Sequence, residues 1–168
     1  MARLAKEIPK EIADYFVYRD GELIRVKTDY PRHNNLVGEP VRAPDGSGYY
    51  QVHFKGARYR VHRVVWFLLN GPIPEGAVID HKDGNVTNNS IENLRLATQK
   101  QNSQNCKSQK HSKTGIRGVS RHAYYKHEPR YQVFVGAQYY GLFDDIELAE
   151  LIAKEARHKV FGEFKGRE

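Results

Sequence analysis

Alternating hydrophobic and polar positions in the first third of the chain predict two β-hairpins. The stretch FVYRDGELIRV alternates on both sides of Asp20 and Gly21, a pair that is typical of a two-residue hairpin turn. The segments GYYQVHF and ARYRVHR flank Lys55 and Gly56 in the same way. Because glycine readily adopts a positive φ, this second pair also suits a tight turn.

The middle of the chain changes from hairpins to a helix, which is followed by a strand, a long loop and a second strand. Residues 62–70 form an apolar segment that ends at Gly71, which predicts a buried helix with a glycine at its C-terminus. Residues 78–81 predict a short strand, and residues 93–97 predict a returning strand. Between them, residues 82–92 are rich in Asn and Asp, as is typical of a loop.

The rest of the chain predicts a short helix, a linker and a small second unit. Thr98 and Gln101 form a capping box, which favours a helix that begins at Thr98. Residues 104–114 are polar and show no apolar periodicity, as is typical of a linker. Three strands follow in GIRGVSR, RYQVFVG and QYYGLF, and a helix is expected to begin at Asp144 with Glu147 as its capping-box partner.

That last helix is expected to pack against the three strands. Phe143 and Leu148 are placed as a hydrophobic staple at its start. One face of the helix is apolar and rich in small residues, which suits close packing on a sheet. The members of this face are Leu148, Ala149, Ile152, Ala153, Ala156 and Val160.

Composition limits the kind of protein this can be. The longest apolar run, residues 64–69, is far shorter than the ~20 residues that span a bilayer, and the first ten residues lack the apolar core of a signal peptide. The single cysteine, Cys106, excludes an internal disulfide and a cysteine-rich zinc site. We therefore expect a cytoplasmic protein without a membrane partner.

Positive charge is concentrated in one short segment. The 168 residues have a net charge of +7, and residues 95–130 contain nine basic residues and one acidic residue. Such a segment is typical of phosphate binding. A solvated linker is the alternative interpretation.

Asp80, His81 and Asn102 are the residues that could cleave a phosphodiester. The reaction needs a hard cation to neutralise charge in the transition state and a base to deprotonate the attacking water. Asp80 and Asn102 offer oxygen ligands for Mg²⁺, for which Mn²⁺ can substitute, and His81 offers the base. Because neighbouring side chains on a strand point to opposite faces, Asp80 and His81 can act on one phosphate only if the strand or loop distorts. A surface pair or a structural histidine is the alternative interpretation, and Asn93 is a candidate to brace the long loop through backbone hydrogen bonds.

Residues 58–105 contain the segments RYRVHRVVW, GPIPEG, DHKDGN, NNSIENLR and QKQNSQN in this order. This set resembles the HNH homing endonucleases of phage genomes and introns. The resemblance implies a strand-strand-helix (ββα-metal) core with one divalent cation and a histidine general base. By position, His81 is the motif histidine, Asn93 the middle asparagine, and Asp80 and Asn102 the metal ligands.

Residues 115–163 contain the segments GIRGVS, RYQVFV, YYGLFDD, ELAELIAKEA and HKVFGEF. They resemble the Apetala-two (ethylene-response-factor) DNA-binding domain, which implies a three-stranded antiparallel sheet in the major groove with a helix behind it. Arg117 matches a family arginine that contacts DNA, and Tyr139 stands where plant members have a contacting tryptophan. Other family arginines are replaced here by Ser120, His122 and Ala137, so we expect different base recognition. Charge and strand alternation suggest nearby substitutes, namely Arg121, Lys126, Arg130 and Gln132.

Together these features predict an α+β DNA endonuclease of two modules, acting in a bacterial or phage-infected cell. The expected parts are a β-hairpin region (1–57), the HNH core (58–109), a basic linker (110–114) and the Apetala-two-like domain (115–168). The expected substrate is double-stranded DNA, nicked by a monomer or cut on both strands by a dimer, and no protein partner is implied. The alternatives are a DNA-binding regulator without nuclease activity and an RNA-binding or intron-splicing helper.

Overall fold

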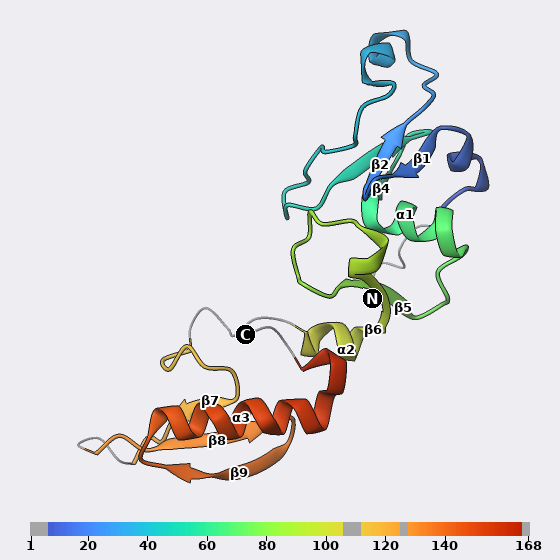
Figure 1. Ribbon diagram of the computed structural model, residues 1–168. Coiled ribbons are helices and arrows are strands. Elements are labelled where there is room, and N and C mark those ends of the chain that lie inside the picture. The colour runs from blue at the N-terminus through green and yellow to red at the C-terminus, as the bar shows by residue number, and fades with distance from the viewer. Residues whose placement is uncertain (1–6, 106–111, 125–127, 166–168) are drawn as a thin grey trace. The chain divides into compact units, whose positions relative to one another are not determined.

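The chain forms two units, each with its own hydrophobic core. A computed structural model describes residues 7–105, 112–124 and 128–165 (Figure 1). The first unit comprises Met1–Gln99 and the second Lys100–Glu168. Both combine short helices with small sheets, which confirms a mixed α/β fold. The linker predicted at 110–114 therefore falls within the second unit, and its first two residues lie outside the described part of the chain, as do Cys106 and Lys126.

The first unit begins with the two predicted hairpins. The turn residues Asp20 and Gly21 have φ values of 51° and 83°, and Lys55 and Gly56 have φ values of 46° and 73°. Left-handed backbone at both central residues matches the right-handed twist of the flanking strands, so these pairs favour tight hairpins. The strands and the short 3₁₀ helices around them are η1 (Lys10–Asp14), β1 (Phe16–Arg19), β2 (Glu22–Arg25), η2 (Pro31–Leu36), β3 (Gln51–Phe54) and β4 (Ala57–Arg60).

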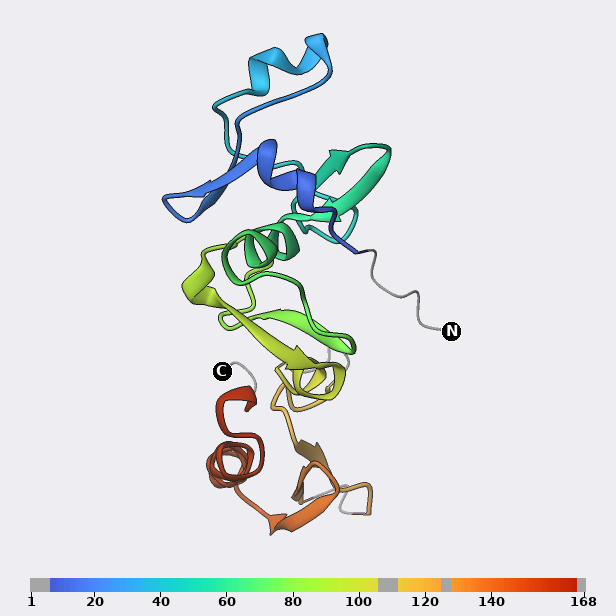
Figure 2. The same ribbon diagram turned by 90° about the vertical axis from the view of Figure 1, so that its right-hand side faces the viewer.

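Helix α1 (Val61–Asn70) lies at the centre of this unit. The two hairpins lie on one side of α1, and β5 (Ala77–His81) and β6 (Leu94–Thr98) lie on the other (Figures 1 and 2). The helix ends as predicted at Gly71, whose φ is 82° and whose N–H donates to the Phe67 carbonyl at 3.0 Å. One core unites all these elements; its fully buried members are Ile12, Phe16, Leu23, Val52, Val61, Val64 and Val65.

The strand, loop, strand and helix order predicted for the middle of the chain is confirmed. β5 and β6 pair in antiparallel register from Ala77 opposite Thr98 to His81 opposite Leu94. The return strand begins one residue later than predicted, because residue 93 belongs to the short helix η3 (Ile91–Asn93). Helix α2 (Gln99–Gln104) follows β6 directly.

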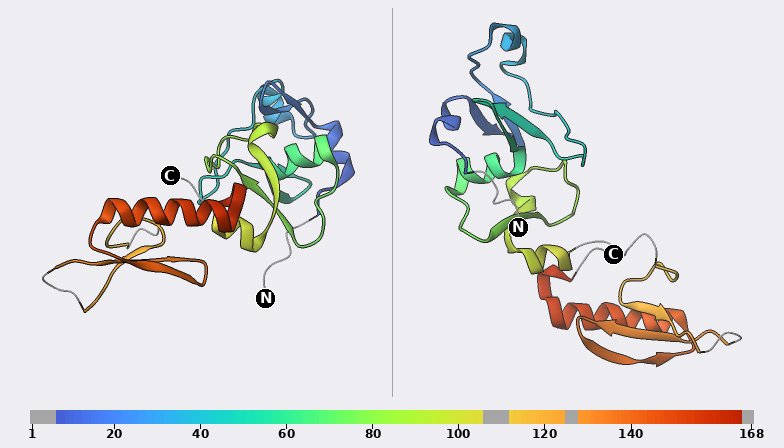
Figure 3. Two further views of the ribbon diagram at one scale, coloured as in Figure 1. Left: turned by 60° about the horizontal axis from the view of Figure 1, so that its bottom comes forward. Right: turned by 180° about the vertical axis from the view of Figure 1, so that it is seen from behind.

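The second unit is a three-stranded antiparallel sheet with one helix along one face (Figure 3). Besides α2, which the unit boundary places here from Lys100 on, its elements are β7 (Val119–Arg121), β8 (Tyr131–Val135), β9 (Gln138–Phe143), α3 (Ile146–Phe161) and η4 (Gly162–Phe164). The core between sheet and helix consists of Val119, Val133, Val135, Ala149, Ala153 and Ala156. Alanines at the interface allow the helix to approach the sheet closely.

The first strand of this unit is shorter than the sequence predicts. Gly115 and Gly118 have φ values of 70° and 83°, so the backbone turns where the segment GIRGVSR is expected to be extended. A Cβ at Gly118 would lie 2.8 Å from the Phe134 carbonyl oxygen. Glycine is therefore required there by both conformation and space.

The predicted start of α3 is wrong by one residue. The N-cap is Asp145, whose Oδ1 accepts hydrogen bonds from the N–H groups of Glu147 at 2.7 Å and Leu148 at 3.4 Å. Glu147 is thus the second helical residue rather than the third, so the capping box from Asp144 does not form. The proposed staple of Phe143 with Leu148 shifts out of register for the same reason.

The predicted apolar face of α3 also needs correction. Leu148 and Val160 are exposed, by 44% and 46%, whereas Ala149, Ala153 and Ala156 are buried. The buried face includes Arg157, which donates to the carbonyl of Arg117. A charged residue occupies this face because the backbone before β7 supplies an acceptor for it.

Candidate active site

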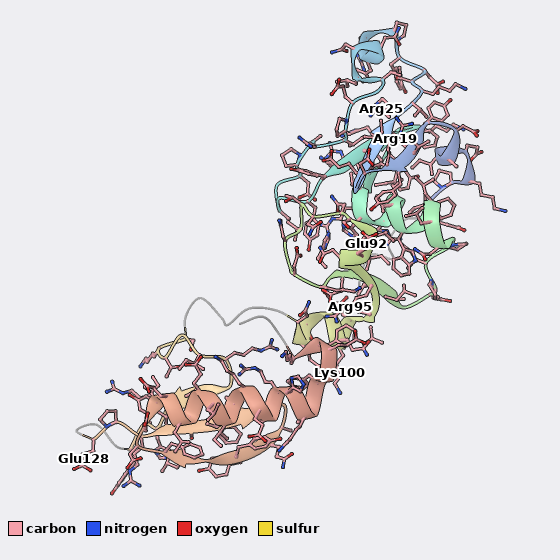
Figure 4. All side chains as sticks on the ribbon, in the orientation of Figure 1. Arg19, Arg25, Glu92, Arg95, Lys100 and Glu128 are labelled. Carbon is pink, nitrogen blue, oxygen red and sulfur yellow. The ribbon has the colours of Figure 1, made fainter. Side chains whose placement is uncertain are left out.

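Strands β5 and β6 place Asp80 directly opposite Arg95. Both Nε and Nη2 of Arg95 lie 2.9 Å from Oδ2 of Asp80. The two side chains are almost fully buried, with 3% of Asp80 and 11% of Arg95 exposed. Burial of a carboxyl group costs free energy unless a hydrogen-bonding or charged group such as this guanidinium faces it. Figure 4 shows Arg95 on β6, of which it is the second residue.

His81 contacts a different set of residues. Its Nε2 lies 3.3 Å from Oδ1 of Asn89, in the loop that follows β5. Its ring centroid is 4.9 Å from that of His62 on α1 and 5.9 Å from that of Tyr49. Asp80 thus contacts β6 whereas His81 contacts the loop and α1, as side-chain alternation along a strand predicts.

His62 gives this cluster a neutral ring. It is 5% exposed, and burial lowers its pKa from 6.5 to about 3, with smaller contributions from His81, Arg60 and Arg63. Within the described residues, its Nδ1 has no hydrogen-bond partner. His62 therefore stays uncharged at neutral pH and adds no fixed positive charge beside His81.

Asn93 braces the loop between β5 and β6. Its Nδ2 donates to Oδ1 of Asp83 and to the carbonyl of Asn88, both at 2.9 Å, and its Oδ1 accepts from the Asp83 N–H at 3.0 Å. Burial alone would raise the pKa of the Asp83 carboxyl, but hydrogen bonds from Asn88, Asn85 and Asn93 outweigh it and lower the pKa. The loop is thus held by the backbone hydrogen bonds that the sequence predicts for Asn93, while a catalytic role for this residue stays a prediction.

The two oxygen ligands predicted for a cation lie in different units. Asp80 is at the end of β5 in the first unit, and Asn102 is on α2 in the second, so a shared cation stays a prediction. Among the described residues, no group of three or more His, Cys, Asp and Glu side chains could hold a metal ion. Mg²⁺ commonly binds through one or two protein carboxylates together with water and substrate phosphate, so the Asp80 carboxyl is a chemically suitable ligand for it.

The segment that contains these residues has recognisable relatives. Residues 59–104 match the sequence model of the HNH endonuclease family. The HNH segment, as we call residues 59–104, includes Asp80, His81, Asn93 and Asn102, and it extends from β4 to the end of α2.

Two curated relatives that match this chain are phage proteins. Protein 3.8 of Escherichia phage T7 is 51% identical over 61 residues, which are 36% of this chain and 50% of the phage protein. DNA endonuclease I-HmuI of Bacillus phage SP01 is 33% identical over 104 residues, 60% of this chain and 55% of that enzyme. A solved structure of I-HmuI, described as showing DNA binding and cleavage, is 32% identical, covers 54% of this chain and 51% of its own, and has a TM-score of 0.40. This chain spans about half the length of these relatives.

Sequence reasoning missed three residues that surround the pair at the end of β5. Arg95 had a usable signal, since an acidic and a basic residue at matching distances from the loop form a cross-strand pair. His62 lies within the predicted apolar helix, where a histidine at a buried position is a reason to search for a partner. Asn89 is one of several asparagines in the loop, and nothing in the loop sequence indicates that this one faces His81.

In the second unit, two of the predicted DNA-binding residues share one face of the sheet. Gln132 and Tyr139 lie opposite the helix-covered face, and Gln132 Nε2 donates to Ser120 Oγ at 3.0 Å. Tyr139 is 53% exposed, and its ring centroid lies 5.0 Å from that of Phe134, its partner across the strands. We call Ser120, Gln132, Phe134 and Tyr139 the outer face.

The predicted arginines lie elsewhere in this unit. Arg117 precedes β7, and its Nη1 donates to the carbonyl of Gln104 at the end of α2. Arg121 is exposed at the end of β7, in register with Tyr131, which packs on the helix side. Arg130 is partly buried just before β8. Their contact with DNA stays a prediction, as does that of Lys126, which lies outside the described residues.

No described helix has both the length and the apolar character needed to cross a membrane.

Proposed function

We propose that this protein is a DNA endonuclease of the HNH type that hydrolyses phosphodiester bonds of double-stranded DNA with the help of a divalent cation. The observation that supports this most is the pair of buried side chains at the end of β5. Asp80 and His81 are consecutive residues there, both buried and both within the HNH segment, with their side chains in contact with different elements. A relative that matches this chain is named a DNA endonuclease.

Asp80 and Asn102 would hold Mg²⁺, or Mn²⁺ in its place. When bound, the cation would stabilise the negative charge that develops on the scissile phosphate. Arg95 fixes the orientation of the Asp80 carboxyl through two contacts with Oδ2. Because burial lowers the local dielectric, these charges act more strongly than they would in water.

His81 would accept a proton from the attacking water. The water oxygen then bonds to phosphorus while the bond to the 3′ oxygen breaks, and that oxygen takes up a proton from solvent. The products are a 3′-hydroxyl and a 5′-phosphate. One such site in a chain favours nicking by a monomer, and cleavage of both strands would require a dimer.

The second unit would anchor the enzyme on DNA. This proposal rests on the Apetala-two resemblance and on the three-stranded sheet, whose outer face exposes a polar and an aromatic side chain from adjacent strands. The basic segment 95–130 would add contacts with phosphates. Gln132 and Tyr139 are the outer-face residues we propose to contact DNA.

Cleavage assays on supercoiled plasmid and on phage genomic DNA test the proposal. The protein is incubated with each DNA in Mg²⁺, in Mn²⁺ or in excess EDTA. We expect nicked products with either cation and none in EDTA, with an unchanged circular dichroism spectrum. Full activity in EDTA would exclude the metal mechanism, and DNA binding without cleavage in either cation would favour the non-catalytic regulator.

A further inference from the structure

Asn89 is in a position to control which nitrogen of His81 carries the proton. Its Oδ1 lies 3.3 Å from Nε2 of His81, and both side chains are buried, with 5% and 4% exposed. A neutral imidazole has one N–H and one bare nitrogen, so a fixed partner on one nitrogen determines the role of the other.

The orientation of the Asn89 amide follows from its second hydrogen bond. Its Nδ2 donates to the carbonyl of Thr87 at 3.2 Å. A carbonyl oxygen can only accept, so the NH₂ group must face Thr87 and the amide oxygen must face His81. Nε2 of His81 is therefore the donor in this contact, and Nδ1 is the nitrogen without a proton.

Aromatic neighbours restrict rotation of the His81 ring. His62 meets it edge to face at 4.9 Å with an interplanar angle of 79°, and Tyr49 lies within 6 Å of both histidine rings. A ring flip would exchange the two nitrogens only by breaking the contact with Asn89 inside this packed cluster. Two independent constraints, one polar and one steric, thus act on the same ring.

We infer that Asn89 is a positioning residue that holds His81 as the Nε2–H tautomer, so that Nδ1 is the nitrogen that accepts the proton of the attacking water. This inference rests on the proposed function for its role in cleavage. The tautomer itself is a property of the free protein and can be measured without DNA or metal.

The test is ¹⁵N NMR of histidine-labelled protein at pH 8.5, with His81 assigned by its loss in His81→Ala. We expect chemical shifts of a predominantly Nε2-protonated ring in the parent protein and in Asn89→Asp, which keeps an acceptor. Asn89→Ala should shift the ring toward a tautomer mixture, and Asn70→Ala, at the exposed end of α1, is the matched control. The inference is overturned if His81 of the parent is predominantly Nδ1-protonated, or if folded Asn89→Ala keeps the tautomer of the parent. If Asn89→Ala does not fold, the spectra of the parent and of Asn89→Asp decide the question.

Cleavage kinetics connect the tautomer with catalysis. With plasmid DNA and Mg²⁺, we expect Asn89→Ala to lower kcat by about 10- to 100-fold with little change in the Kd for DNA, and Asn89→Asp to recover most of the rate. Equal rates for Asn89→Ala and the parent would overturn the positioning role. If no protein cleaves DNA while the parent shows the expected tautomer, the proposed function fails and the structural assignment stands.

Discussion

Replacement of His62 by phenylalanine should flatten the dependence of stability on pH. His62 has an ordinary pKa of 6.5 in the unfolded chain, and burial lowers it to about 3 in the folded protein. Between these values the unfolded state binds a proton that the folded state excludes. Protonation therefore favours unfolding, and the contribution of neutral His62 to stability is complete above pH 6.5 and is lost as the pH falls toward 3.

The magnitude follows from the size of the shift. Each pH unit below 6.5 lowers the free energy of unfolding by about 1.4 kcal/mol, so the loss at pH 5 is about 2 kcal/mol. His62→Phe retains an aromatic ring in contact with the rings of Tyr49 and His81 but has no titrating group. Between pH 7.5 and pH 5, we expect the free energy of unfolding of the parent to decrease by about 2 kcal/mol more than that of His62→Phe.

Urea denaturation followed by tryptophan fluorescence measures this difference. Trp66 is the single tryptophan of the chain and packs against the core of the first unit, so it reports on the unit that contains His62. His53→Phe removes an exposed histidine of β3 and is the matched control, for which we expect the slope of the parent. Parallel stability curves for the parent and His62→Phe would refute the reasoning, and the smaller variant His62→Leu repeats the test if phenylalanine does not fit.

Three further outcomes are expected. Arg95→Met should lower the free energy of unfolding by about 3 kcal/mol in urea titrations, because it removes the guanidinium that faces the buried Asp80 carboxyl. A loss below about 1 kcal/mol would mean that the pair is not needed for stability. Asp80→Ala and Asn102→Ala should each abolish metal-dependent nicking while DNA binding in gel shifts persists, and retained nicking would remove that residue from the proposed ligands. Tyr139→Ala should weaken DNA binding by about tenfold if the contact contributes ~1–3 kcal/mol, with Leu151→Ala on α3 as the exposed apolar control; equal effects of the two would argue against the outer face.

The elements of this fold could be predicted where short-range chemistry decides them. Both hairpin turns form at pairs with a glycine, and α1 ends at a glycine that adopts positive φ. The start of α3 is ambiguous by one residue because Asp144 and Asp145 are both suitable N-caps, and only the folded backbone selects Asp145. The turn before β7 is not evident from the sequence because the need for glycine at position 118 depends on the close approach of β8.

The candidate residues follow from the sequence, whereas their surroundings do not. The resemblance to HNH endonucleases selects Asp80, His81, Asn93 and Asn102 by their positions in the motifs, and their roles in catalysis and metal binding stay predictions. The partner Arg95 depends on strand register, and the contacts of His81 depend on how α1 and the loop pack around β5. The Arg95 pairing could be inferred only by assuming the strand register, and the contacts of His81 are tertiary features that the sequence pattern does not contain.

Mapping of DNA ends with and without His81 tests the central claim most directly. The parent, His81→Ala and the exposed-histidine control His53→Ala are incubated with phage genomic DNA and Mg²⁺, and the ends are sequenced after ligation that requires a 5′-phosphate and a 3′-hydroxyl. The account predicts ligatable ends from the parent and from His53→Ala, and none from His81→Ala, although His81→Ala still binds the DNA within about threefold of the parent. Undiminished cleavage by folded His81→Ala, or no cleavage by the parent in either Mg²⁺ or Mn²⁺, would contradict it.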